Sequence, residues 1–283
     1  MGAAQDHPTR SADITPADRR TTSRPRYLIT GGAGAAARGI RPLLRDRGVD
    51  LVLLDVVPSD PQPGETAVQA DLTDADAVRR AVCGVDMVVH LGGFSRERPW
   101  SDVARANVEG TRTLLQAMVD ERVRNGLIAS STHVVGFWPV PDEPVETLPP
   151  RPDSLYGVSK VAMEAMASAY ADRHDLVLTV ARIGTVEPLP TSPRSLATWL
   201  SLPDLVRLIE AAAVHAAPGA HPVWAVSHNT RRWFSLAPGR AVGYEPQDDA
   251  ERYADAFPDP GDVGNGLIGG AFADGERPLG VAW

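Results

Sequence analysis

Short apolar runs alternate with stretches of helical periodicity from residue 26 onward. The apolar runs predict strands at RYLIT (26–30), LVLLD (51–55), TAVQADL (66–72), DMVVHL (86–91), NGLIASS (125–131) and DLVLTVARI (175–183). Helical spacing between them predicts helices over residues 73–83, with Thr73 as N-cap, over about 101–123, and from near Tyr156 to about 173. Continuous apolar strands that alternate with helices are typical of a parallel sheet covered on both faces. We therefore predict an α/β, Rossmann-like doubly wound fold.

The alternation breaks down beyond residue 184. SLPDLVRLIEAAA (201–213) predicts a helix that opens with a capping box between Ser201 and Asp204, and PVWAVS (222–227) predicts one more strand. The residues after these are rich in Gly, Pro and Asp and indicate loops and short helices. We predict a cofactor-binding core over 26–185 and a substrate-binding region over 186–283 packed on it. Residues 1–25 are polar and aperiodic, which predicts a disordered tail.

Composition and charge argue against several functions. A net charge of −8 disfavours a nucleic-acid-binding surface. The single cysteine, Cys83, excludes an intramolecular disulfide and a metal site with two cysteine ligands, and its apolar context predicts a small core residue. No apolar run approaches the roughly 20 residues that span a bilayer, no secretory signal is apparent, and no His spacing indicates a metal site. We predict a cytoplasmic protein with neither a metal nor a membrane partner.

The junction after the first predicted strand is made of small residues. Gly31 and Gly34 have the spacing of a dinucleotide-binding loop, with Ala37 where a third glycine is common. Such a loop lets the backbone approach a pyrophosphate at the helix N-terminus, although small residues also serve simple close packing. Asp55 ends the next strand, where an acid can bind the adenosine ribose and repel a 2′-phosphate. This favours NAD over NADP, although Arg38 nearby would tolerate NADP, and a strand-end acid can also be merely solvated.

Tyr156 and Lys160, in SLYGVSK, lie one turn apart and share a helix face. By itself this spacing also fits an ordinary helix with one aromatic and one solvated charge. A free tyrosine loses its proton near pH 10, so a base at neutral pH needs a stabilised phenolate. The ammonium of Lys160 and a positively charged nicotinamide would supply that stabilisation. A hydroxyl at the end of the fifth strand, Ser130-Ser131-Thr132, would hold the substrate oxygen during proton abstraction and hydride transfer.

Together these motifs resemble the extended short-chain dehydrogenase/reductase family over residues 26–283. The matching elements are the TGGAGAAA loop (30–37), Asp55, Asp71-Leu72, HLGG (90–93), NVEGT (107–111), ASS (129–131) and YGVSK (156–160). Longer stretches resemble the uronate dehydrogenases, which oxidise D-glucuronate and D-galacturonate at C1 with NAD to an aldarolactone. These are HLGGFSRERPW (90–100), ASSTHVVGFWP (129–139), RPDSLYGVSK (151–160), RIGTVEPLPTSPRSLATWLS (182–201) and VWAVSHN (223–229).

The resemblance implies a role for each matching residue. Tyr156 would be the base, Lys160 its electrostatic partner and a ribose ligand, and Ser131 the donor to the reacting oxygen. Substrate contacts are implied for Ser95, Ser131, Thr132, His133, Thr185 and Arg194, whose guanidinium would clamp the substrate carboxylate through two parallel hydrogen bonds. NAD contacts are implied for Gly31, Gly34, Ala35, Ala36, Asp55, Asp71, Leu72, Leu91, Gly92, Gly93, Asn107, Tyr156 and Lys160.

One departure bears on specificity. Thr132 stands where uronate dehydrogenases usually have Asn, in SSNH. A hydroxyl on a β-branched side chain cannot reproduce the donor and acceptor pair of an amide. The preference among sugar acids is therefore left open, and a different substrate would fit the same change.

Three functions are weighed at this point, and other sugar dehydrogenases stay open beside them. The first is an NAD-dependent uronate dehydrogenase acting on a small-molecule sugar acid, expected to be a homo-oligomer. A nucleotide-sugar epimerase or dehydratase is disfavoured because a nucleotide-diphosphate sugar needs a larger C-terminal region. A non-catalytic cofactor-binding regulator is disfavoured because both Tyr156 and Lys160 are present. The sequence leaves the lactone ring size, the oligomeric state and the pathway open.

Overall fold

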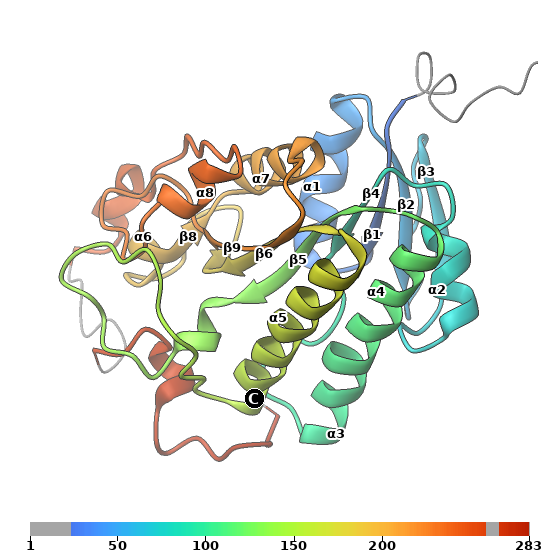
Figure 1. Cartoon of the computed structure of the whole chain (residues 1–283). Helices are drawn as coiled ribbons and strands as arrows, with labels where there is room; N and C mark the ends of the chain where they lie inside the picture. The colour runs from blue at the N-terminus through green and yellow to red at the C-terminus, as the bar shows by residue number, and fades with distance from the viewer. Residues whose placement is uncertain (1–23, 259–265, 283) are drawn as a thin grey trace, which may run out of the picture.

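A computed structural model describes residues 24–258 and 266–282, which form a parallel sheet with helices on both faces (Figure 1). The sheet has seven strands in the order β3-β2-β1-β4-β5-β6-β9. They are β1 (Arg26–Thr30), β2 (Asp50–Asp55), β3 (Glu65–Gln69), β4 (Met87–His90), β5 (Asn125–Ser131), β6 (Val177–Ile183) and β9 (Gly219–Ala225). The predicted doubly wound fold is confirmed. The predicted disordered tail lies outside the described residues, apart from Arg24 and Pro25.

Each face of the sheet has its own core. On one face, α1 (Ala35–Asp46) and α7 (Leu202–Val214) pack over the sheet, and on the other lie α2 (Ala75–Val82), α4 (Gly110–Asp120) and α5 (Leu155–His174). Within β2, Leu51 and Leu53 pack in the first core while Val52 and Leu54 pack in the second. Because successive strand side chains point to opposite faces, this split explains why the run is apolar throughout.

The predicted helix over 101–123 is divided in the structure. It consists of α3 (Trp100–Val103), a π-helical segment η2 (Ala104–Glu109) and α4. The wider π-helical turn places Asn107 in the interior, with no exposed surface. Such insertions often occur at functional sites. Here the distortion lies directly behind the loop that follows β4.

Three local predictions were wrong in detail. The N-cap of α2 is Asp74, whose side chain accepts from the Ala77 N–H, because Thr73 bonds to Asp71 instead. Cys83 is exposed, since it follows the last residue of α2 and points away from the core. At α7 the Ser201 side chain accepts from the Asp204 N–H as predicted, but the Asp204 carboxylate turns away to the N–H groups of residues 247 and 248. The capping box is therefore only half formed.

The chain after residue 185 contributes to both core and site. It adds β9 beside β6 and packs α7 against α1. Its remaining elements are β7 (Thr185–Val186), α6 (Ser195–Thr198), β8 (Trp199–Leu200), α8 (Ala237–Ala241), η4 (Ala250–Ala256) and η5 (Gly270–Ala273). We retain the division at 185 as a proposal about which segment binds substrate. Among the described residues, no helix is long and apolar enough to cross a membrane.

Candidate active site

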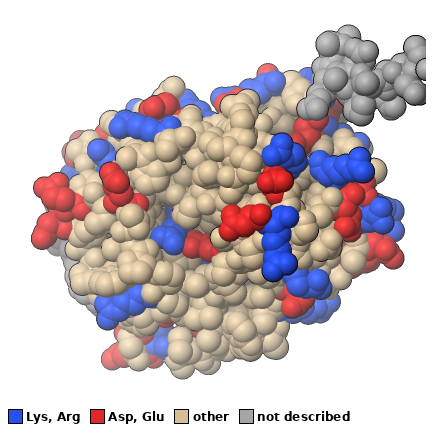
Figure 2. All heavy atoms as spheres, in the orientation of Figure 1, with Lys and Arg blue, Asp and Glu red and all other residues tan. Residues whose placement is uncertain are grey.

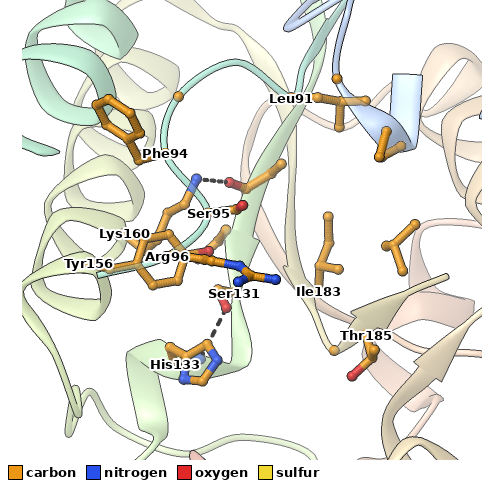
Figure 3. A pocket seen from close by; sticks show the side chains of 18 of the residues that line it. Leu91, Phe94, Ser95, Arg96, Ser131, His133, Tyr156, Lys160, Ile183 and Thr185 are labelled. Carbon is orange, nitrogen blue, oxygen red and sulfur yellow. Dashed lines mark hydrogen bonds between the residues drawn. The ribbon is translucent and has the colours of Figure 1, made fainter. Parts of the chain in front are cut away.

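Two adjoining cavities open at the carboxyl ends of the strands. The larger has a volume of about 640 Å³ and is bounded by the segments after β1, β4, β5 and β6 and by residues 271–277 (Figure 3). The second, of about 510 Å³, lies on the other side of the Gly31 loop against the ends of β2 and β3. Strand order reverses between β1 and β4, and ligands of open α/β sheets bind at such a switch point.

The loop after β1 is shaped for close approach of a ligand. Gly31 has a φ of 70°, and a Cβ there would lie 2.9 Å from the Cα of Gly92, so the two loops touch through glycines. Gly34 begins α1 without any side-chain cap, which leaves the first N–H groups of the helix available to an anion. The predicted residues Gly31, Gly34, Ala35, Ala36, Leu91 and Gly93 all line the larger cavity.

The second cavity contains the predicted adenosine-side residues Asp55, Asp71, Leu72 and Gly92. Asp55 accepts from the Ala33 N–H at 3.0 Å and from the Val57 N–H at 3.2 Å, which fixes its carboxylate at the end of β2. Arg38 does not line this cavity; it lies in a separate hollow beyond Ala33. Asp55, which disfavours a 2′-phosphate, is thus inside the cavity and Arg38 is outside it. Arg105 also lines the cavity, but it pairs with Asp71 at 2.8 Å.

The start of α5 brings Tyr156 and Lys160 to the cavity. The Ser154 side chain caps the helix by accepting from the Gly157 N–H, and both Tyr156 and Lys160 are only 5% exposed. Tyr156 shares a hydrogen bond with Ser131, at the end of β5. The Lys160 ammonium donates to the Ala129 carbonyl at 2.7 Å and lies 5.7 Å from the centre of the Tyr156 ring (Figure 3). The three predicted catalytic residues are therefore brought together.

Burial controls the protonation of this pair. Desolvation raises the pKa of Tyr156 to about 12, opposed by the hydrogen bond from Ser131, and it lowers the pKa of Lys160 to about 8. The sequence argument predicts a lowered pKa for Tyr156 from Lys160 together with a bound, positively charged nicotinamide, and that combined effect stays a prediction. Ser131 is a side chain that acts to lower this pKa, whereas the ammonium of Lys160 is directed at the Ala129 carbonyl.

Four predicted substrate contacts, Ser95, His133, Thr185 and Arg194, line the larger cavity. The His133 ring stacks on Phe272 with 3.8 Å between centroids, and its Nδ1 lies 2.7 Å from the buried Asp153 carboxylate. Since a carboxylate only accepts, Nδ1 is the donor, and Nε2 is the ring nitrogen left for a ligand. Asp153 was not predicted. Nothing in its local sequence distinguishes it from a loop acid.

Arg194 is the buried cation of the cavity. Its Nη2 donates to the Ile268 carbonyl at 2.8 Å, and its Nη1 lies 3.3 Å from Thr185 Oγ1 and 3.4 Å from Thr198 Oγ1. Burial lowers its pKa to about 10, so the guanidinium stays charged at neutral pH. No carboxylate in the described chain forms a salt bridge with it. The buried Asp153 acts on this guanidinium electrostatically without a salt bridge, so the guanidinium can still pair an anionic group in the cavity.

Two predicted ligand contacts are not at either cavity wall. Thr132 is fully buried, and its Oγ1 has no hydrogen-bond partner among the described residues. Asn107 is also fully buried; it accepts from the Phe94 N–H at 2.8 Å and donates to the Phe94 carbonyl and to Ser159. Thr132 turns inward because the chain enters a single 3-10 turn, η3 (Thr132–Val135), directly after β5. Asn107 positions the loop after β4 and does not itself line a cavity.

Glu97 is a site residue that the sequence reasoning missed. Although it lies among arginines in SRERPW, it is only 1% exposed. Its carboxylate accepts from the N–H groups of Leu155 at 3.2 Å, Tyr156 at 2.9 Å and Gly280 at 2.7 Å. One side chain thereby holds together the loop after β4, the first turn of α5 and the C-terminal segment.

We expect Glu97→Gln to lower the Tm by about 4 °C and to reduce turnover. Glutamine has the same shape, but its NH2 group would face a buried N–H that has lost its acceptor, at a cost of about 1–3 kcal/mol. Thermal unfolding followed by circular dichroism measures the effect. The exposed Glu143 offers a matched control, since Glu143→Gln removes the same charge without a buried partner. Equal Tm values for the two variants would contradict the view that the Glu97 carboxylate holds these three segments together.

The fold and the site define a class before any relative is considered. A glycine loop at a helix N-terminus, an acid ending the second strand and a Tyr–Lys pair over one cavity characterise nucleotide-cofactor-dependent dehydrogenases and reductases with a doubly wound sheet. The chain belongs to the NAD dependent epimerase/dehydratase family, whose model matches residues 27–222. The predicted family resemblance is thus confirmed.

Individual relatives are similar over almost their whole length. A uronate dehydrogenase of Pseudomonas syringae pv. tomato is 38% identical, covering 90% of this chain and 96% of that one. An NAD-dependent glucose-6-phosphate dehydrogenase of Haloferax volcanii is 35% identical, covering 80% and 94%. The crystal structure of uronate dehydrogenase from Agrobacterium tumefaciens matches with a TM-score of 0.84 and 36% identity, covering 91% and 98%. A tyrosine-to-alanine mutant of that enzyme, complexed with NAD, also matches with a TM-score of 0.84.

Proposed function

We propose that the protein is an NAD-dependent uronate dehydrogenase that oxidises C1 of D-glucuronate or D-galacturonate to the aldarolactone. The observation that carries this proposal is the buried Arg194, which forms no salt bridge within the described residues and shares a cavity with Tyr156, Ser131 and Lys160. A carboxylate bound there would be paired by a planar, charged donor. The uronate dehydrogenase relatives support the same substrate class.

The cavity residues fit NAD. The uncapped start of α1 and the glycine contact between Gly31 and Gly92 would hold the pyrophosphate, and Asp55 would bind the adenosine ribose. When bound, NAD would supply the hydride acceptor and a positively charged ring near the phenol of Tyr156. Asn107 supports this region indirectly, through its hydrogen bonds to Phe94.

The protein side of the reaction is a proton transfer. Tyr156 would take the proton of the anomeric hydroxyl while Ser131 orients the same oxygen. Because burial holds the pKa of Tyr156 at about 12, the phenol is protonated at neutral pH until further positive charge enters the cavity. Lys160, whose pKa burial lowers to about 8, stays mostly protonated at neutral pH and would bind the ribose as a charged donor. The homo-oligomeric state and the cytoplasmic location stay predictions.

Substrate profiling tests the proposal. Purified protein is mixed with NAD and, separately, with glucuronate, galacturonate, glucose and a nucleotide-diphosphate glucose, and NADH absorbance is followed. We expect NADH with the two uronates and little with glucose, because only a uronate offers a carboxylate to Arg194. If neither uronate gives NADH and the nucleotide sugar is converted, the result would favour the epimerase or dehydratase alternative.

A further inference from the structure

We propose that the same cavity also oxidises a hexose 6-phosphate, and that Arg96 binds its phosphoryl group. This inference rests on the proposed C1 oxidation and adds a second anionic substrate class to it. Its basis is the charge of the cavity wall. Arg96, Lys160, Arg194 and Arg277 line the larger cavity, and no Asp or Glu is among the described residues that do so.

The charged residues of this cavity wall are all basic, which differs from the charge of the chain as a whole. The chain carries a net charge of −8, and acidic and basic side chains are interspersed on the face shown in Figure 2. A cleft lined by one sign of charge concentrates ligands of the opposite sign. A uronate brings a single negative charge, whereas a phosphate monoester brings about 1.5 to 2 at pH 7. Besides Arg194, the cavity wall therefore carries the exposed Arg96, a cation that the pairing of Arg194 with one carboxylate does not use.

Arg96 is an exposed cation of this wall, carried by a loop whose next residue is anchored. It follows Ser95 in the loop after β4, and its side chain extends into the cavity towards Ser131 (Figure 3). The next residue, Glu97, is anchored by three backbone N–H groups, which fixes the loop on which Arg96 is carried. No carboxylate in the described chain pairs with Arg96, so its five N–H donors remain available to a ligand oxygen. An arginine presented in this way suits a phosphoryl group.

Arg98 provides an internal comparison two residues further along. Its guanidinium lies over the Phe94 ring at 5.4 Å, and it is outside the cavity wall. The same loop therefore directs one arginine into the cavity and places the other on an aromatic ring. Thr132, where the sequence placed the change in specificity, is fully buried and outside the wall. We therefore assign the difference in substrate specificity to Arg96 and not to Thr132.

The chemistry needs no new group. The substrate would bind as the cyclic hemiacetal, with its C6 phosphoryl group near the arginines. The C1–H bond breaks and its hydride reduces NAD to NADH, the hydroxyl proton passes to Tyr156 and then to solvent, and C1 becomes the carbonyl of a 6-phospholactone. The relative from Haloferax volcanii carries the name of an enzyme that oxidises such a phosphate.

Kinetics on three forms of the full chain test the inference. NADH formation is measured with glucuronate and with glucose 6-phosphate for the wild type, Arg96→Met and the control Arg98→Met, and the product is verified by mass. We expect the wild type to oxidise both substrates. In Arg96→Met, kcat/KM should fall at least about 10-fold further for glucose 6-phosphate than for glucuronate, the size of one lost charge-assisted pair. Arg98→Met should leave the ratio of the two values unchanged.

Different failures have different meanings. If the protein oxidises glucuronate but does not oxidise glucose 6-phosphate, the inference is overturned and the proposed function stays intact. Equal losses for both substrates in Arg96→Met, with a raised KM for NAD, would assign Arg96 to the cofactor and also overturn it. Oxidation of glucose 6-phosphate alone would support the inference and overturn the uronate proposal.

Discussion

Replacing Tyr156 with Phe is expected to lower kcat about 1000-fold, within the range of about 100 to 10,000 for general acid–base catalysis. The phenol is buried, hydrogen-bonded to Ser131 and placed on the cavity wall, so removing its oxygen deletes the proton acceptor and little else. Affinity for NAD should change by less than about 3-fold, because the loop at Gly31 and the carboxylate of Asp55 are untouched. Steady-state kinetics and NAD titration measure the two quantities.

The same helix supplies a control. Tyr170 lies in α5 away from both cavities, with its hydroxyl 3.3 Å from Gln116 Oε1. Tyr170→Phe should leave kcat close to the wild-type value. Loss of NAD binding in Tyr156→Phe would show that the phenol holds the cofactor. Retained turnover would move the base to another group, with His133 the nearest candidate on the cavity wall.

Replacing Arg194 with Met is expected to reduce kcat/KM for glucuronate about 100-fold, which corresponds to about 2.7 kcal/mol of lost transition-state binding. The guanidinium is desolvated, so a substrate carboxylate would form charge-assisted hydrogen bonds that water weakens little. Methionine keeps much of the arginine side-chain volume without the charge. We expect the loss to appear mainly in KM, because the carboxylate is paired in the ground state as well.

Two further measurements decide whether Arg194 acts on the substrate. Arg194→Lys keeps the charge but cannot offer two parallel donors, so its loss should be intermediate. Arg231→Met removes an exposed arginine paired with Glu251 and should have no effect on kcat/KM. An equal loss for glucuronate and for a neutral aldose in Arg194→Met would show a structural role, through the Ile268 carbonyl and the threonines that its guanidinium contacts.

The local pattern of apolar and polar residues was sufficient to predict the strands and to locate the residues that belong to motifs. The predicted strand 125–131 coincides with β5 (Asn125–Ser131), because its apolar run lies between polar residues and is buried on both faces. The Gly31 loop and the Tyr156–Lys160 pair were also located from the sequence, through their spacing together with the surrounding motifs and the family resemblance. Hydrophobic periodicity and backbone geometry act over a few residues, so the sequence displays them directly.

The directions of particular side chains depended on contacts between distant segments. Glu97 resembles a solvated acid in the sequence, but it meets the N–H of Gly280, a residue 183 positions away. Thr132 and Asn107 carry polar side chains at motif positions, and only the 3-10 turn and the π-helical segment turn them into the interior. The pKa of Tyr156 depends on burial by the assembled fold, which the spacing to Lys160 does not contain. The sequence by itself determined the fold class, because this follows from local periodicity, and the family resemblance of its motifs implied the chemistry available to the site. The tertiary structure alone decided which side chains face the cavity and how charged it is, because burial and orientation arise where segments remote in sequence pack together.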